Sequence, residues 1–148
     1  MSDTAPPAPT KLELLELLAA IGTAQWREFA AAAAQHGLTS TQARVLAQLD
    51  GPVPMRGLAT LLVCDASNVT GIVDRLEARG LVRREPSPAD RRVKNVVATD
   101  AGRQVIRVVR EEMQAIHGAL DTLDEDESAT LYALLGRLRP SLEKGARA

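Results

Sequence analysis

The sequence RGLATLLVCDASNVTGIVDRLEARGLVRREPSPADRRVKNVVA, residues 56–98, contains the strongest structural signal in the chain. Within it, residues 56–62 and 66–79 carry apolar side chains at helical spacing, and only three residues separate them. Gly80 can adopt the left-handed backbone conformation that ends a helix. Two short amphipathic helices joined by a tight turn predict a helix-turn-helix, although many compact helical proteins contain such a corner.

The segment after the second helix strengthens this prediction. Residues 81–85 and 94–98 have the composition of two strands, and the tip between them, residues 86–92, is rich in turn-forming and basic residues. From 81 to 95 five basic residues against two acidic ones give a local charge of +3, whereas the whole chain has a net charge of −1. The acidic run is elsewhere, at 121–127. A basic hairpin after a helix-turn-helix predicts a winged helix that meets phosphate.

Two helices are predicted before the helix-turn-helix. Thr10 and Glu13 have the spacing of a capping box, so a helix should begin just after the Pro-rich start and end at Gly37. Thr39 opens a second helix with the same spacing, and Pro52 stops it because proline lacks the backbone N–H.

Two more helices are predicted after the wing. Thr99 caps a fifth helix, whose apolar positions run from Val105 to Leu120. Asp124 caps a sixth helix, which Pro140 should kink or end. The predicted fold class is therefore mainly α with a small β-hairpin wing (α+β), a winged helix-turn-helix with flanking helices.

The composition fits one globular domain, since the chain has 148 residues, of which 45% are apolar and 25% charged. No apolar run reaches the roughly 18 residues that a membrane span needs, and the polar, Pro-rich start is unlike a secretory signal. Cys64 is the single cysteine, so no intramolecular disulfide can form. These features predict a cytoplasmic protein without a membrane partner.

Residues 58–82, LATLLVCDASNVTGIVDRLEARGLV, closely resemble the recognition region of MarR-type transcriptional regulators. The tip DRR at 90–92 and the segment ATDAG at 98–102 are similar to that family's wing and to its usual Leu-Thr-x-x-Gly. The resemblance runs from about residue 10 to residue 142. Three positions depart from the family pattern in residue type: Val63, Gly71 and Ala98.

The resemblance implies a homodimer in which the first, fifth and sixth helices of each subunit interlock. It also implies effector pockets between the dimer region and the DNA-binding lobes. The expected organisation is a disordered tail at 1–9, a dimerisation helix at 10–37, a winged helix-turn-helix lobe at 38–100 and C-terminal dimerisation helices at 101–148. Two such lobes should place their recognition helices about 34 Å apart on a pseudo-palindromic site.

The predicted recognition helix begins with short polar side chains. Such a helix enters the major groove with its N-terminal residues facing the base edges. Asn68 can bridge N6 and N7 of adenine, while Ser67 and Thr70 can serve bases or phosphates. Gly71 would let the backbone approach DNA closely, and Arg75 suits a phosphate or a neighbouring base. The alternative is that these groups only cap and solvate the start of the helix.

The wing tip supplies the second predicted contact. Arg92 or Arg91 would enter the minor groove, where narrow A·T-rich segments concentrate negative potential, and the resemblance places the inserted residue at Arg92. Asp90 would hold the arginine by a charge-assisted pair. The alternative is a solvated hairpin with an exposed ion pair. Weaker candidates for phosphate contacts are Lys94, Arg56, Arg83 and Arg84.

The remaining distinctive side chains have simpler interpretations. Cys64 fits an apolar slot of the helix-turn-helix bend, where buried cysteine behaves as a small hydrophobe, and thiol-based redox sensing is the alternative. His36 and His117 are lone histidines without further ligands at metal-binding spacing, so neither a metal nor a cofactor is expected. Trp26 and Phe29 pack the core or, alternatively, line an effector pocket.

Together these features predict a homodimeric, sequence-specific DNA-binding transcriptional regulator. It is expected to act as a repressor that a small-molecule effector releases from a pseudo-palindromic operator, and release by an effector is implied by the resemblance alone. The alternative is a winged-helix dimer that binds other proteins and does not read DNA. No nucleophile–base motif, phosphate loop or HExxH site occurs, so no enzymatic activity is expected.

Overall fold

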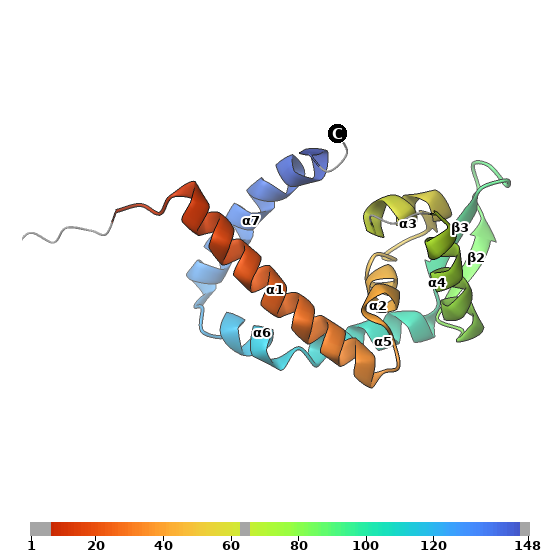
Figure 1. Cartoon of the computed structure of the whole chain (residues 1–148), viewed down its shortest axis with the longest axis horizontal. Coiled ribbons are helices and arrows are strands. Elements are labelled where there is room, and N and C mark those ends of the chain that lie inside the picture. Colours follow the sequence, from red (N-terminus) through yellow and green to blue (C-terminus); the bar gives the residue numbers. More distant parts are fainter. Residues whose placement is uncertain (1–6, 63–65, 146–148) are drawn as a thin grey trace, which may run out of the picture. The chain divides into compact units, whose positions relative to one another are not determined.

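The computed structural model describes residues 7–62 and 66–145. The chain divides into two compact units, with the boundary between Met113 and Gln114. The elements of the first unit are α1 (Lys11–Gln35), α2 (Ser40–Ala47), β1 (Val53–Pro54), α3 (Met55–Leu62), α4 (Ala66–Ala78), β2 (Val82–Pro86), β3 (Lys94–Ala98) and α5 (Asp100–Glu111) (Figure 1). Those of the second unit are α6 (Gln114–Leu120) and α7 (Glu125–Gly145). The predicted fold class, mainly helical with a β-hairpin wing, is confirmed.

Three helices of the first unit begin at the capping residues that the sequence indicated. The N–H of Glu13 donates to Thr10 Oγ1 at 3.2 Å, and the N–H of Thr10 donates back to Glu13 Oε2 at 2.7 Å. Thr39 and Gln42 repeat this reciprocal pair at the start of α2, with distances of 3.0 and 3.1 Å. The hydroxyl of Thr99 caps α5. The predicted starts are confirmed because each cap satisfies N–H groups that the first helical turn leaves unpaired.

Helices α1 and α4 end in the same way, at glycines with left-handed backbone conformations. Gly37 has a φ of 66° and Gly80 a φ of 69°. At both ends the N–H of the following leucine donates back into the helix at 3.0 Å, from Leu38 to Ala33 and from Leu81 to Leu76. Both leucines are buried, so each turn closes its helix and anchors the next segment in the core.

The sheet is antiparallel with the strand order β1-β3-β2. Strands β2 and β3 form the predicted wing hairpin, in which Val82 pairs with Ala98 and Pro86 with Lys94. Strand β1 was not predicted, because its two residues are too few for a periodic pattern and follow a stop signal for α2. It adds a third strand through the pairing of Val53 with Val96.

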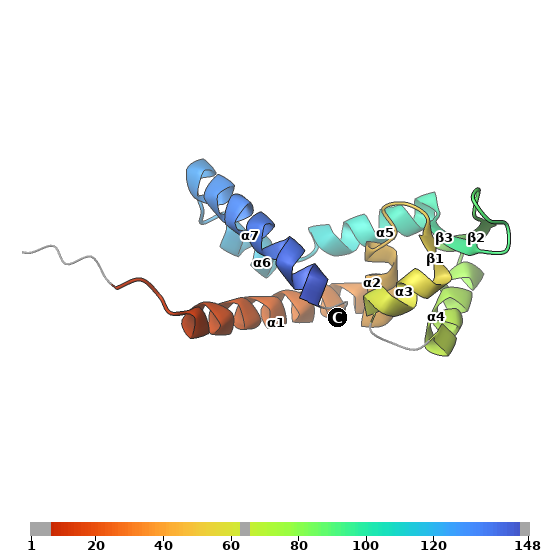
Figure 2. The same cartoon turned by 90° about the horizontal axis from the view of Figure 1, so that it is seen from above.

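The core of the first unit lies where the helices meet the hairpin. Helix α4 packs on α2, α3 and β2, while α1, α2 and α5 pack on one another. Figures 1 and 2 both show α4 beside the β2–β3 hairpin. The largest fully buried side chains are aliphatic, as the scarcity of aromatic residues requires: Leu58, Leu76, Val45, Val69, Val73, Val82, Val96 and Val109.

The predicted single helix from Thr99 to Leu120 is wrong. Helix α5 ends at Glu111, and α6 begins at Gln114. No glycine or proline marks this break, and the two residues within it make tertiary contacts. The carboxylate of Glu112 reaches the ring of His36 at the end of α1, at 2.8 Å, and Met113 is buried at 5% exposure.

Helix α7 begins at the predicted cap. The N–H of Glu127 donates to Asp124 Oδ1 at 2.9 Å, and the N–H of Asp124 donates to Glu127 Oε2 at 3.0 Å. Of the two outcomes expected at Pro140, the helix does not end there, since it continues to Gly145. A proline removes one backbone donor, and this helix continues beyond that loss. Within the described residues no helix combines the length and the apolar character that crossing a bilayer needs.

Gly102, in the first turn of α5, allows this helix to approach the end of α4 closely. A Cβ at this position would lie 2.0 Å from the carbonyl oxygen of Leu81 and 3.3 Å from Leu46 Cδ2. The same carbonyl accepts the N–H of Thr99 at 3.0 Å, so it cannot move away without losing that bond. The close approach therefore requires glycine.

We predict that Gly102→Ala destabilises the protein by about 1–3 kcal/mol or more, because the methyl group collides with backbone atoms. Urea unfolding followed by circular dichroism measures the change. The matched control is Gly71→Ala in α4, where an added Cβ meets nothing within 4 Å. Equal stability of the two variants would contradict this account.

Candidate nucleic-acid interface

Helix α4 has one apolar and one polar face. The apolar side chains of Val69, Ile72, Val73 and Leu76 are at most 6% exposed. They fall on one side of the helix at the spacing that the sequence showed, and this side packs against the rest of the lobe. The opposite face is exposed along the helix.

The predicted base-contacting residues of α4 lie on its exposed face. Asn68, Thr70 and Arg75 are exposed, and Gly71 is half-buried with open space where a Cβ would be. At about 100° per residue, Gly71 falls near the middle of this face. Ser67 is in the first turn of α4, and its side chain lies outside the described residues. The helix therefore presents a face of short side chains, with a basic residue one turn further on.

Arg84 of β2 is held against α4 by two carboxylates. Its Nη2 donates to Asp74 Oδ1 at 2.5 Å, its Nη1 donates to Glu77 Oε2, and its backbone N–H donates to Glu77 Oε1 at 3.0 Å. Partial burial lowers the pKa of the Arg84 guanidinium, but the hydrogen bonds of Asp74 and Glu77 outweigh it, so the pKa is raised. Arg84 thus attaches the wing to α4, which corrects its interpretation as a phosphate contact.

Asp90 shapes the tip of the wing through the backbone. Its Oδ1 accepts the N–H of Arg92 at 3.0 Å, and its carbonyl accepts the N–H of Val93 at 2.9 Å. In the described part of the chain its carboxylate pairs with no guanidinium, unlike the charge-assisted pair expected from the sequence. The reason is local, because an aspartate at a turn bonds the backbone two residues on. The side chains of Arg91 and Arg92 are exposed at this tip.

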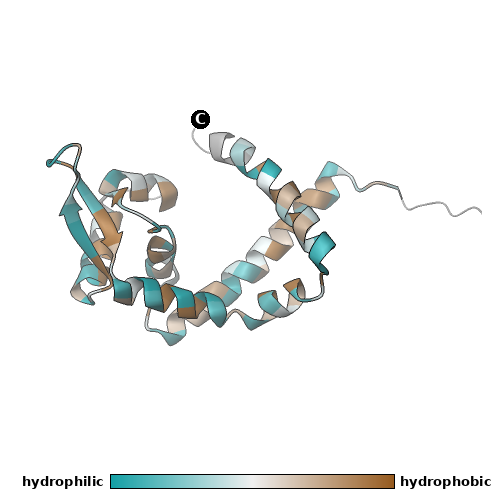
Figure 3. Cartoon of the chain, turned by 180° about the vertical axis from the view of Figure 1, so that it is seen from behind, coloured by the Kyte–Doolittle hydropathy of each residue, from teal (hydrophilic) through white to brown (hydrophobic). Residues whose placement is uncertain are grey.

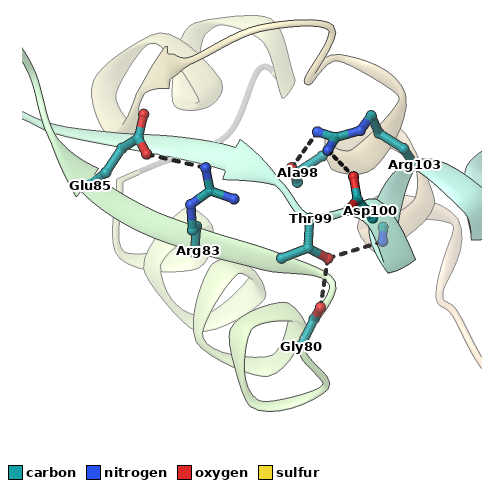
Figure 4. Close-up of polar contacts among 8 residues, drawn as sticks. Gly80, Arg83, Glu85, Ala98, Thr99, Asp100 and Arg103 are labelled. Carbon is teal, nitrogen blue, oxygen red and sulfur yellow. Dashed lines mark hydrogen bonds and ion pairs between the residues drawn. The ribbon is translucent and has the colours of Figure 1, made fainter.

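The other basic residues of the lobe differ in their surroundings. Arg83 forms an ion pair with Glu85 at 3.4 Å on β2 (Figure 4). Lys94, at the start of β3, and Arg56, in α3, are exposed. The structure therefore leaves Lys94 and Arg56 as the weaker phosphate candidates with exposed side chains.

Polar bonds fix the base of the wing to the ends of two helices, as Figure 4 shows. Thr99 Oγ1 donates to the carbonyl of Gly80 at 2.6 Å and accepts the N–H of Gly102 at 3.1 Å. Arg103 donates to the carbonyl of Ala98 at 2.6 Å and pairs with Asp100. These bonds hold β3 and α5 against the C-terminal end of α4.

A cavity of about 220 Å³ lies between α1, α2 and α5. Trp26 and Phe29, the two candidates for an effector pocket, both contribute to its lining, and their rings stack with centroids 5.7 Å apart. Phe29 is also buried at 6% exposure, so it belongs to the core as well as to the cavity. The guanidinium of Arg44 lies 5.7 Å from the centroid of the Trp26 ring.

Sequence reasoning did not find two cationic residues of this cavity. Arg44 and Arg110 both line it, and Arg110 Nη2 donates to the carbonyl of Ala47 at 3.3 Å. On amphipathic helices such arginines look like ordinary surface residues. Only the approach of α1 to α2 and α5 brings them beside Trp26.

Comparison with known proteins agrees with this geometry. Residues 38–94 match the model of the MarR family. The chain is 38% identical over 86 residues to the HTH-type transcriptional regulator PecS of Dickeya dadantii, and the match covers 57% of this chain and 52% of PecS, about half the length of that relative.

Two solved structures match over nearly their whole length. The transcriptional regulator Tm0710 from Thermotoga maritima is 30% identical with a TM-score of 0.69, and the match covers 93% of this chain and 99% of that one. CouR from Rhodococcus jostii, solved with p-coumaroyl-CoA bound, is 31% identical with a TM-score of 0.64, over 88% and 89% of the two chains. The relatives are transcriptional regulators and not enzymes. The chain therefore belongs to the MarR family of transcriptional regulators, as its recognition region and wing predicted.

Proposed function

We propose that this protein is a homodimeric, sequence-specific DNA-binding regulator that represses transcription and that a small-molecule effector releases from a pseudo-palindromic site. The observation that carries the DNA-binding part is the exposed face of α4, which the Arg84 bridge ties to a wing with two exposed arginines at its tip. A helix face of short side chains suits the major groove of DNA, and the basic hairpin beside it suits the adjacent minor groove.

The proposed contacts divide into base reading and positioning. Asn68 bonds an adenine edge in the major groove, with Ser67 and Thr70 beside it, and Gly71 lets the backbone come close. Arg75 contacts phosphate. At the wing, Arg92 enters the minor groove with Arg91 near the backbone, while Asp90 fixes the tip and Lys94 adds a phosphate contact.

Exposed apolar side chains on helices of both units support a dimer. Helix α1 carries six that are between 43% and 63% exposed: Leu12, Leu14, Leu15, Leu17, Leu18 and Ile21. Among the described side chains of α7, four are between 38% and 49% exposed, Leu131, Leu134, Leu135 and Leu138, and Figure 3 shows apolar positions along this helix in brown. A monomer rarely exposes so much apolar surface, so we assign residues 10–37 and 101–148 to dimerisation and 38–100 to DNA binding.

The cavity beside Trp26 and Phe29 supports the effector part of the proposal. Stacked rings with Arg44 and Arg110 suit a planar ligand with a negative charge. Its volume of about 220 Å³ lies below the roughly 300–1,000 Å³ usual for drug-sized ligands, which favours a small molecule. CouR was solved with a much larger ligand, p-coumaroyl-CoA, so only part of such a molecule would fit here.

Two alternatives have weaker support. A dimer that binds only proteins would have no use for exposed arginines at the tip of the wing. Thiol sensing would require Cys64, which lies outside the described residues.

The first prediction from the proposed function concerns the wing. With a duplex selected by the wild-type protein from genomic fragments, Arg92→Ala should weaken binding by about 1–3 kcal/mol and reduce the slope of log affinity against log salt by about one, because one phosphate-region contact is lost. Fluorescence anisotropy at several salt concentrations measures both. Arg107→Ala, on the exposed side of α5, is the control, and as long as light scattering shows that it remains a dimer it should change neither. An unchanged Arg92→Ala slope and affinity would refute the wing role.

A second prediction concerns position 71. In the free protein Gly71→Ala should increase stability by roughly 0.5–1 kcal/mol, because alanine favours the helix and meets no neighbour. Binding to the same duplex should weaken by about 1–3 kcal/mol, the cost of one disturbed base contact. Unfolding curves and DNA titrations on one preparation test both the gain in stability and the loss of affinity. Undiminished binding would exclude a close approach of this backbone to DNA.

A third prediction concerns the dimer. Leu18→Glu places a charge in the apolar surface of α1, so the mass in solution should fall from that of two chains to that of one. Light scattering after gel filtration measures it. Leu61→Glu on α3 is the matched control, since both leucines are 43% exposed. A monomeric wild-type protein, or a variant that stays dimeric, would contradict the assignment of α1 to the interface.

A further inference from the structure

We propose that Arg79 is a positioning residue, which holds the C-terminal end of the recognition helix α4 to the C-terminal end of α1. This inference rests on the proposed DNA-binding function and adds to it the residue that sets the tilt of α4. Arg79 directly follows α4. Its Nη1 donates to the carbonyl of Gly37 at 2.7 Å, and its Nη2 donates to the carbonyl of His36 at 3.0 Å.

The turn at the end of α1 offers the Arg79 guanidinium both space and carbonyl acceptors. Gly37 has the left-handed backbone conformation, and the position that its Cβ would take lies 3.8 and 4.0 Å from the two terminal nitrogens of Arg79. The last turn of α1 contains no basic residue of its own, although the C-terminus of a 25-residue helix attracts positive charge. Arg79 supplies that charge from another helix. Because the guanidinium is planar, its two hydrogen bonds fix the direction of Arg79 as well as its distance from the turn.

The same turn is also bonded to α5. The ring of His36 contacts Glu112, the residue that caps the end of α5, at 2.8 Å. Helices α1 and α5 also provide Trp26, Phe29 and Arg110 to the cavity. One short turn therefore connects the helices of the cavity to the end of the recognition helix.

A small change at Arg79 has a large effect at the other end of α4. Asn68 lies eleven residues before Arg79, about 16 Å along a helix axis at about 1.5 Å per residue. A tilt of about 4° about the C-terminal end then moves Asn68 by about 1 Å, enough to spoil a base contact. The Arg84 bridge holds the middle of α4, and Thr99 bonds the turn after α4 to the wing, whereas Arg79 ties this end to α1.

Positioning and direct phosphate contact predict different salt dependence. A phosphate contact contributes to every DNA complex and to the salt slope, whereas a positioning residue affects only the duplex whose bases are read. Arg75, one turn earlier on the same helix, provides the comparison because it is proposed to contact phosphate.

The experiment uses full-length Arg79→Met and Arg75→Met with two duplexes, one selected by the wild-type protein from a randomised library and one scrambled. Arg79→Met should bind the selected duplex about tenfold more weakly than the wild-type protein does. Its affinity for the scrambled duplex and the slope of log affinity against log salt should stay unchanged. Arg75→Met should weaken both and reduce the slope by about one. Arg79→Lys, which keeps the charge but loses the fork, should resemble Arg79→Met. Equal weakening on both duplexes with a reduced slope, or no change, would overturn the proposal.

A measurement without DNA keeps this inference separate from the proposed function. Amide hydrogen exchange should become faster at residues 76–81 and 33–38 in Arg79→Met, and should stay unchanged in β3. If the wild-type protein selects no duplex, the proposed function fails, and the exchange result alone still tests the link between α4 and α1. If Arg79→Met does not fold, Arg79→Lys replaces it in both assays, and exchange equal to the wild-type rate would refute the link.

Discussion

The carbonyl of Leu81 is a fixed point shared by four elements of the DNA-binding lobe. Leu81 directly follows the turn that ends α4 and leads into β2, while Thr99 leaves β3 and opens α5 with its N–H bonded to this carbonyl at 3.0 Å. Gly102 comes so close that a methyl group would stand 2.0 Å from the oxygen. This backbone contact is packed without spare room, and together with the bonds of Arg84 to Asp74 and Glu77 it fixes α4 relative to the wing.

The basic residues around this contact have two different tasks. Arg79, Arg84 and Arg103 are bonded to backbone carbonyls or carboxylates within the protein, so they hold helices and strands together. Arg91 and Arg92 stay exposed at the tip of the wing. The local charge of +3 counted from sequence therefore overstates the positive charge offered to DNA, because the carboxylates that neutralise Arg84 belong to α4, outside the counted segment.

Much of the fold could be predicted because its signals are local. Capping boxes such as Thr10 with Glu13, and the glycines that end α1 and α4, act within a few residues, so the sequence indicated where helices begin and end. The break after α5 could not be predicted, since no local signal marks it and the contact found there joins Glu112 to His36, which is 76 residues away. The exposed face of α4 could be predicted because helical periodicity is a local signal. The role of Arg84 and the cationic residues of the cavity could not, because they depend on contacts between distant segments.

Gly71 has a consequence for how such a regulator can change over time. A Cβ at this position would meet no other atom within 4 Å, and the buried side chains of α4 lie on the opposite face. Most other residues would also favour the helix more than glycine does. In the proposed DNA complex, target preference at this position is therefore separable from folding. A duplicated copy of the gene could acquire a new binding sequence through substitutions at position 71 without first becoming less stable.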